Sequence, residues 1–315
     1  MNLSWQSSAV GSILMLGLLS SCGVPSSTIS SDDPQAKINA INGANLALSS
    51  QNCSGALSQV LPFYDSVYSD NQIRLITSSA YGCHAGINIF KVLDDLIHFS
   101  GDFGGSGFWE FLVSEFPSSS STIDNKVSQA AKNAIDAAMS AIKPGTILVP
   151  EYIVNASSNN PASLLNTDRI DDANSYLTFL GMSLMGSLMS FNGLPLANHH
   201  KSVPLPWTDA TLMAGDGCSL ASGLLIFIDG LNSIIGVAGS SSVARHYETI
   251  ETFLTAGADL ACQAGCAICG GSVSCTVCPV SLRDRTSCTG VNTDVNSCAA
   301  AGLVNFINST WAGPP

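Results

Sequence analysis

Cys-Gln-Ala-Gly-Cys-Ala-Ile-Cys-Gly-Gly-Ser-Val-Ser-Cys-Thr-Val-Cys, residues 262–278, opens a tail that carries seven cysteines: Cys262, Cys266, Cys269, Cys275, Cys278, Cys288 and Cys298. Its two Cys-x-x-Cys pairs could together enclose a tetrahedral Zn²⁺. The five-residue gap between these pairs is shorter than in the usual zinc ribbon, and the spacing differs from that of ferredoxins. The chemistry of the tail therefore depends on its compartment, because exported thiols pair as disulfides.

The compartment is indicated by the start of the chain. An apolar run from Ala9 to Leu19 is followed by Ser20, Ser21 and Cys22, as in a secretory signal with small residues before its cleavage site. The stretch Leu19-Ser20-Ser21-Cys22 resembles the lipobox of bacterial lipoproteins, which signal peptidase II cleaves before a diacylglyceryl-modified cysteine. It departs from that pattern in having no Lys or Arg in residues 2–21. The alternatives are an ordinary cleaved signal and a short buried helix with a chance cysteine.

The lipobox resemblance implies a location and an anchor. Residues 1–21 would be the signal peptide, and Cys22 would become the first residue, carrying acyl chains such as palmitate. Gly23 follows where proteobacterial sorting rules place Asp for inner-membrane retention, which favours the outer membrane. We expect a cell-envelope protein that faces the periplasm or the cell surface, with residues 22–35 as the lipidated cysteine and a flexible tether.

Cysteine parity agrees with export. The chain has eleven cysteines, and lipidation of Cys22 would leave ten, which can pair completely. Seven in the tail is an odd number, so one should reach back, for example to Cys218, and Cys53 and Cys83 could bridge neighbouring helices. We therefore favour disulfides over a tail metal site or a redox-active Cys-x-x-Cys pair, which remain the alternatives.

The rest of the chain has helical periodicity. We expect an all-α fold, a helical bundle or degenerate array of helical hairpins, with a helical domain at 36–261 and a disulfide-rich segment with a terminal helix at 262–315. The Ala173–Ala197 segment carries no charge, but its serines favour a buried central helix over a membrane span. The apolar segment 218–238 looks broken at Asp229-Gly230. Helices are predicted over residues 36–49, 53–68, 71–83, 84–99, 124–142, 167–192, 243–262 and 294–310.

The spacing of two alanines in the N-terminal part is typical of a known type of helical hairpin. Ala44 and Ala56 are twelve residues apart around the polar turn 49–52, which is similar to a tetratricopeptide-type helical hairpin over residues 37–90. Pro62 and Phe63 depart from that pattern, and no 34-residue repeat follows. Degenerate repeats of this kind occur in helical periplasmic lipoproteins. An unrelated Ala-rich bundle is the alternative.

Composition excludes some partners. The net charge is −12, and the eleven basic residues are scattered, so no basic patch exists for nucleic acid. Charged residues make up only 11% of the chain. A body with so few charges must bury its apolar surface or use it on a partner or ligand.

An aromatic stretch is the candidate pocket. Residues 100–107 form a glycine-rich loop that lacks the Lys and Ser/Thr of a phosphate loop. The aromatic residues around it predict either a core or the wall of an apolar ligand pocket, built from Phe99, Phe103, Phe108 and Trp109.

Catalytic signatures and cofactor motifs are missing from the sequence. We therefore expect a non-enzymatic envelope protein that acts as a protein-interaction scaffold or as an accessory binder of an apolar ligand, without a cofactor. The alternative is an envelope hydrolase with a site near His199-His200, and a third class is a redox or metal protein that uses the tail. His98 lies one helical turn after Asp94 and Asp95, an arrangement that a surface ion pair explains as well as catalysis does.

Overall fold

The fold is that of a computed structural model, which describes residues 33–64, 71–84, 87–98, 105–116, 167–192, 216–238, 242–269, 273–283, 287–290 and 294–311. Within these ranges every regular element is a helix, so the predicted all-α class is confirmed. The predicted helix 124–142 lies outside them, as do Cys22, Phe99, Phe103 and His199-His200. The elements are α1 (Pro34–Ser49), α2 (Cys53–Tyr64), α3 (Asn71–His84), α4 (Ile89–His98), α5 (Ser106–Glu115), α8 (Thr167–Asn192), α10 (Cys218–Ala238), α11 (Ser242–Ile268), the 3₁₀ helix η2 (Val280–Arg283) and α12 (Val295–Thr310).

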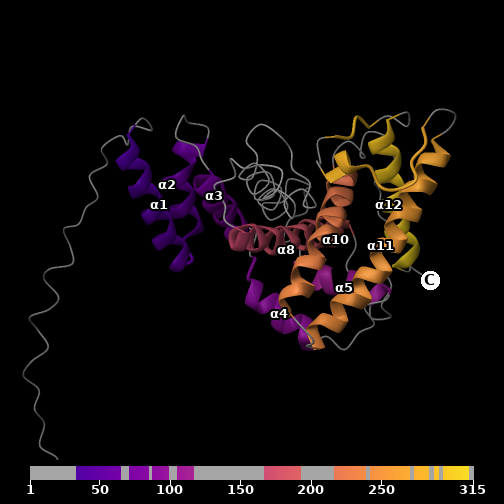
Figure 1. The fold of residues 1–315 in the computed structure, drawn as a ribbon, viewed down its shortest axis with the longest axis horizontal. Helices are drawn as coiled ribbons and strands as arrows, with labels where there is room; N and C mark the ends of the chain where they lie inside the picture. Colours follow the sequence, from indigo (N-terminus) through magenta and orange to yellow (C-terminus); the bar gives the residue numbers. More distant parts are fainter. Residues whose placement is uncertain are drawn as a thin grey trace, which may run out of the picture.

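Helices α1 to α3 pack around a core of their own at one end of the molecule (Figure 1). Asp33 caps α1, accepting a hydrogen bond from the Gln35 backbone at 2.8 Å, and Pro34 occupies the first turn, where its missing N–H costs nothing. The Oδ1 atom of Asn52 accepts from the Gly55 backbone at 2.9 Å at the start of α2. The buried residues of this first core are Ala40, Ile41, Ala44, Ala56, Val60, Phe63, Ile73, Ile76 and Ala80.

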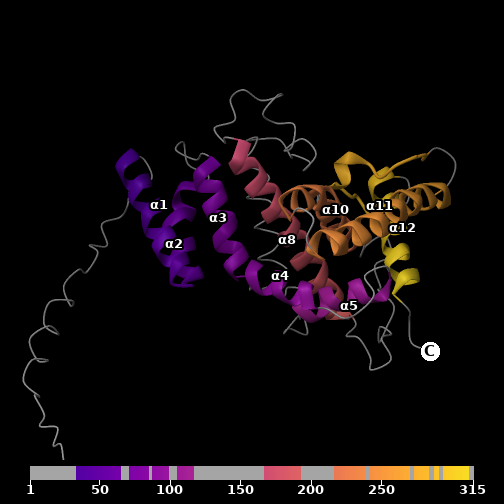
Figure 2. The same cartoon turned by 60° about the horizontal axis from the view of Figure 1, so that its bottom comes forward.

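Helix α8 is the centre of the second, larger core. All residues from 178 to 190 are buried, so the segment is the central helix that the sequence predicts. Gly181 lets it approach α10, since a Cβ atom there would lie 2.7 Å from the carbonyl oxygen of Gly223. Figures 1 and 2 both place α8 between the N-terminal helices and α10. At the N-terminal side, the Tyr176 hydroxyl donates to the Ser78 carbonyl at 3.3 Å.

Among the residues that the structure describes, no helix is long and apolar enough to cross a membrane. Two serines of α8 are accommodated within the helix, because Ser187 and Ser190 donate to the carbonyls of Leu184 and Ser187.

The predictions for α4, α10 and α11 differ from the structure, and residues 65–68 of the predicted second helix lie outside the described residues. Helix α4 begins at Ile89 rather than at residue 84, because Asn88 accepts a capping hydrogen bond from the Lys91 backbone at 3.2 Å. Helix α10 continues unbroken through Asp229-Gly230. Helix α11 extends to Ile268, past the expected end at Cys262, so it crosses the expected boundary between the helical domain and the cysteine-rich segment.

Candidate docking groove

One disulfide joins the N-terminal helices α2 and α3, and the other four hold the C-terminal part together. The pairs are Cys53–Cys83, Cys218–Cys288, Cys262–Cys278, Cys266–Cys275 and Cys269–Cys298. The disulfide-rich C-terminal segment is therefore confirmed. Each Cys-x-x-Cys pair is split between different partners, so neither forms a redox-active disulfide within the motif. With all seven tail sulfurs bonded to sulfur, no tail thiolate is left for a zinc ion.

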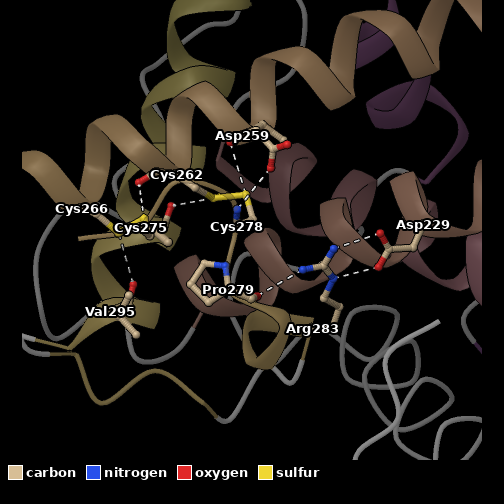
Figure 3. The surroundings of a disulfide bond; sticks show 11 residues. Asp229, Asp259, Cys262, Cys266, Cys275, Cys278, Pro279, Arg283 and Val295 are labelled. Atoms are coloured by element: carbon tan, nitrogen blue, oxygen red, sulfur yellow. Dashed lines mark hydrogen bonds and ion pairs between the residues drawn. A yellow bond between two sulfur atoms is a disulfide. The ribbon is translucent and has the colours of Figure 1, made fainter. Parts of the chain in front are cut away.

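An ion pair joins the tail to α10. Arg283, in η2, places Nε 2.8 Å and Nη2 3.0 Å from the two carboxylate oxygens of Asp229, and Figure 3 shows the pair beside the Cys262–Cys278 disulfide. The Ser222 hydroxyl also donates to the carbonyl of Arg283. The partner of Asp229 comes from the tail, which explains why α10 accommodates a carboxylate in its buried middle.

Helices α11 and α12 approach each other unusually closely. A Cβ atom on Gly302 would overlap the carbonyl oxygen of Ala261, and one on Gly265 would overlap that of Cys298. The Cys269–Cys298 disulfide closes the same pair of helices covalently. Glycine is therefore required at these two positions, and the backbones form a shallow floor between the helices.

A groove of about 450 Å³ runs along this floor and is open to solvent. Leu260 and Ile268 stand at its edge with 66% and 79% of their surface exposed. None of the lining residues is charged; they are Gly257, Leu260, Ala261, Ala264, Gly265, Ile268, Gly302, Asn305, Phe306 and Ser309. An exposed apolar surface with polar residues at its rim is a feature that binding regions share.

An aromatic cluster supports the groove from inside. Phe306, in the groove wall, contacts Phe253 at a ring-centroid distance of 5.6 Å and Trp109 at 6.3 Å. Trp109 in turn packs on Phe108, which stacks on Phe227 at 5.3 Å. The indole Nε1 of Trp109 donates to the Thr310 hydroxyl at 3.0 Å and so ties α5 to α12. The wall is thus held rigidly by the core behind it.

Of the aromatic pocket candidates, the structure describes Phe108 and Trp109. Both are completely buried in the larger core, so they form its packing rather than the open wall of a pocket. Phe99 and Phe103 lie outside the described residues. Trp109 nevertheless reaches the groove indirectly, through its contact with Phe306.

The described histidine with a carboxylate neighbour is a surface group. The Nδ1 atom of His98 lies 3.4 Å from the carboxylate of Asp94 and 2.8 Å from its backbone carbonyl, and each side chain is 71% exposed. This is the surface pair that the sequence offers as an alternative to catalysis. Within the described ranges, no group of three or more His, Cys, Asp or Glu residues is placed to hold a metal ion.

Asp294 anchors the start of α12, the second helix of the groove. Its carboxylate accepts from the Ser297 hydroxyl at 2.7 Å, from the Ser297 backbone at 3.1 Å and from the Thr289 backbone at 3.3 Å. Partial burial raises the pKa of Asp294, but these hydrogen bonds outweigh that effect and hold the pKa below its usual value.

None of the residues that line the groove is among the candidate site residues predicted from the sequence. A signal for them does exist, because residues 252–268 carry a single charge, Asp259, and residues 295–310 carry none. Small residues also recur every four positions at Gly257, Ala261 and Gly265. These patterns predict close helix packing, but the exposure of Leu260 and Ile268 depends on where α12 lies.

We compared the chain with protein families, with curated proteins and with solved structures. No protein-family model matches the chain, and neither the curated proteins nor the solved structures include one that is significantly similar to it. We therefore infer function from the residues and contacts described above.

Proposed function

We propose that this chain is a non-enzymatic, lipid-anchored protein of the bacterial cell envelope that works as a protein-interaction scaffold. The groove between α11 and α12 is its docking site, and the occupant is an apolar α-helical segment of a protein. The observation that carries this proposal is the exposure of Leu260 and Ile268 at the edge of a groove without charged residues.

The shape of the groove favours a helix over a small apolar ligand. A small-molecule pocket encloses about 70–90% of its ligand. This groove is open to solvent and lies between two helices, as in complexes where an amphipathic helix lays its apolar face into a groove. Asn305 and Ser309 supply polar contacts at the rim of such a complex.

The anchor is proposed from the lipobox resemblance at Leu19–Cys22, and outer-membrane location from Gly23. Five disulfides support an exported, oxidising location. They also use all ten cysteines other than Cys22, so lipidation of Cys22 would leave no cysteine without a covalent partner. Each acyl methylene that enters the bilayer contributes about 0.8 kcal/mol, so several chains would hold the protein stably.

The anchor is tested by metabolic labelling with an alkyne analogue of palmitate. We expect the wild-type chain to incorporate the label and to fractionate with membranes, and Cys22→Ser to lose both properties. Labelling that survives in Cys22→Ser, or a wild-type chain that remains unlabelled, contradicts the proposed anchor.

The docking site is tested by photo-crosslinking in cells that make the full chain. The crosslinking residue p-benzoylphenylalanine replaces Leu260, and in a matched control it replaces Leu46, which is 73% exposed on α1. We expect a covalent adduct with a protein from position 260 that Ile268→Ser abolishes, and none from position 46. Adducts of equal yield from both positions, or no protein adduct from position 260, contradict the docking site.

A further inference from the structure

The five disulfides of the described residues fall into two kinds by burial. Each of the four C-terminal disulfides has at least one cysteine that is almost completely buried, with between 0% and 7% of its surface exposed. In the N-terminal disulfide both partners, Cys53 and Cys83, are partly exposed. Cys53–Cys83 is therefore the pair among these five that is open to solvent at both residues.

The two kinds also differ in their packing. The eight C-terminal cysteines belong to the larger core, where six are buried and Cys269 and Cys275 pack against the others. The core that α1, α2 and α3 share includes neither Cys53 nor Cys83. These two residues lie at helix ends, Cys53 as the first residue of α2 and Cys83 as the next to last of α3. Opening their disulfide therefore takes no side chain out of a core.

Burial also decides how readily a disulfide opens once it is attacked. In thiol–disulfide exchange one of the two sulfurs departs as a thiolate. Attack at the partly exposed Cys275 would release its partner, Cys266, inside the larger core, where a thiolate lacks hydration and leaves poorly. Attack on Cys53–Cys83 releases a thiolate at the surface of the molecule.

The C-terminal disulfides also hold one another closed. Cys262, Cys266 and Cys269 follow one another along α11, and each is bonded to a different partner. When one of these disulfides opens, its neighbours keep the two sulfurs close together, so the pair re-forms at a high effective concentration. The Cys53–Cys83 pair has no such neighbour, because residues 23–217 contain no other cysteine.

We propose that Cys53–Cys83 is a site of thiol–disulfide exchange whose co-reactant is a dithiol, the reduced Cys-x-x-Cys pair of an oxidoreductase. A thiolate of the dithiol attacks one sulfur of the pair and forms a mixed disulfide with it, and the other sulfur leaves as a thiolate and takes up a proton. The second thiol of the dithiol loses its proton and displaces the bound sulfur. Two electrons pass to this chain, which ends with two thiols, and the dithiol ends as a disulfide.

The exchange acts on one end of the molecule. Reduction removes the covalent link between α2 and α3, whereas Cys269–Cys298 keeps α11 and α12 joined. Figure 1 shows α1 to α3 at the opposite end of the molecule from α11 and α12. The proposal is therefore independent of the docking site between α11 and α12.

The first experiment treats the full oxidised chain with a series of dithiothreitol concentrations in the absence of denaturant. Iodoacetamide blocks the free thiols at each concentration, and peptide mass spectrometry locates them. We expect Cys53 and Cys83 to open at a concentration roughly tenfold or more below that needed for any C-terminal pair. In urea this difference should shrink, because unfolding exposes every pair.

The second experiment tests the dithiol mechanism with thioredoxin whose second active-site cysteine is replaced by serine. This probe forms the mixed disulfide and cannot resolve it. We expect a covalent product with the wild-type chain at Cys53 or Cys83, and none with Cys53→Ala/Cys83→Ala. In that variant the C-terminal cysteines should stay closed to iodoacetamide, which shows that the larger core is folded.

Three results overturn the proposal. Reduction of a C-terminal pair at the same or a lower dithiothreitol concentration refutes the selective exposure of Cys53–Cys83. A thioredoxin adduct at a C-terminal cysteine of the wild-type chain places the exchange elsewhere. Selective reduction by dithiothreitol without any thioredoxin adduct refutes a Cys-x-x-Cys protein as the co-reactant.

Discussion

The guanidinium of Arg283 and the carboxylate of Asp229 form a two-point ion pair across 54 residues of sequence, with distances of 2.8 and 3.0 Å. Both side chains are largely buried, at 9% and 12% exposure. The third guanidinium nitrogen, Nη1, donates to the carbonyl of Pro279 at 3.2 Å. The pair thereby holds η2 against the middle of α10, close to the disulfide Cys262–Cys278 (Figure 3).

Removal of one member of this pair should destabilise the fold strongly. Asp229→Leu leaves the Arg283 charge buried without its partner, a change that typically costs about 3–5 kcal/mol. The double variant Asp229→Leu/Arg283→Met removes both charges, so it should recover most of that loss. The free energy of unfolding in urea at neutral pH measures both effects.

An exposed ion pair serves as the control. Lys91 contacts Asp95 one turn away on α4, where the side chains are 59% and 38% exposed. Asp95→Asn should therefore leave the urea midpoint unchanged, because solvent screens the pair and Lys91 keeps its second partner, Glu115, at 2.7 Å. An equal loss of stability in Asp95→Asn and Asp229→Leu would contradict the role assigned to burial.

Helix α10 shows how far the sequence alone predicts this fold. Helix periodicity is local, so it predicts α1, α8 and α12 closely. Asp229 interrupts the apolar pattern of α10, so the sequence predicts that the helix ends there. The helix continues because Asp229 pairs with Arg283, which lies 54 residues further along the chain. The hydrophobic periodicity of α10 cannot predict this ion pair, because the two residues meet only in the folded protein.

The candidate groove is likewise predicted only in part by the sequence. Parity allows the ten cysteines other than Cys22 to pair completely, and the structure pairs Cys53 with Cys83 and Cys218 with Cys288. Which of the remaining tail sulfurs pair with each other depends on how α11 and α12 pack. Leu260 and Ile268 have the spacing of core residues, and only the position of α12 leaves them exposed. The sequence therefore predicts an apolar helix there but not a groove.

The Cys53–Cys83 disulfide should stabilise the N-terminal helices alone. It joins α2 to α3, whose core cluster is separate from the larger one. The variant Cys53→Ala/Cys83→Ala removes a constraint that is typically worth about 2–4 kcal/mol. We expect faster amide hydrogen exchange in α1 to α3 and unchanged exchange in α10 to α12.

The matched variant is Cys218→Ala/Cys288→Ala, which cuts the link from α10 to the tail in the larger core. Its faster exchange should appear in α10 and α12. If both variants accelerate exchange over the whole molecule, the two cores unfold as one unit and the separation of their stability is wrong.

Gly302→Ala should separate α11 from α12. The added methyl group would overlap the backbone of Ala261, which has no rotamer to relieve the contact. Overpacking of this kind costs roughly 1–3 kcal/mol. We expect a lower melting temperature in circular dichroism and a lower yield of the photo-crosslinked adduct from position 260, because the groove floor widens.

Gly43→Ala is the control for the introduced methyl group. Gly43 lies within α1, where the atoms nearest to an added Cβ belong to the Gln59 side chain, the closest being Oε1 at 3.3 Å. That side chain can rotate away, and Ala is favoured over Gly inside a helix by about 1 kcal/mol. The melting temperature should stay the same or rise, and a fall equal to that of Gly302→Ala would refute the backbone overlap as the cause.

Asp294 should make the stability of α12 depend on pH. Its pKa in the folded chain is lowered, so its ionised form stabilises the fold above the unfolded pKa of about 3.9, and this contribution is lost as the pH falls through the folded pKa. Asp294→Asn keeps one acceptor oxygen but lacks the charge, and Asp294→Ala removes the cap at a cost of roughly 0.5–2 kcal/mol.

The pH profile distinguishes the charge from the cap. At neutral pH we expect both variants to melt below the wild-type chain, with Asp294→Ala the lower. As the pH falls below about 4, protonation removes the advantage of the wild-type carboxylate, so its melting curve should approach that of Asp294→Asn. A difference between wild type and Asp294→Asn that persists unchanged at pH 2 would mean that geometry, rather than charge, makes Asp294 the better cap of α12.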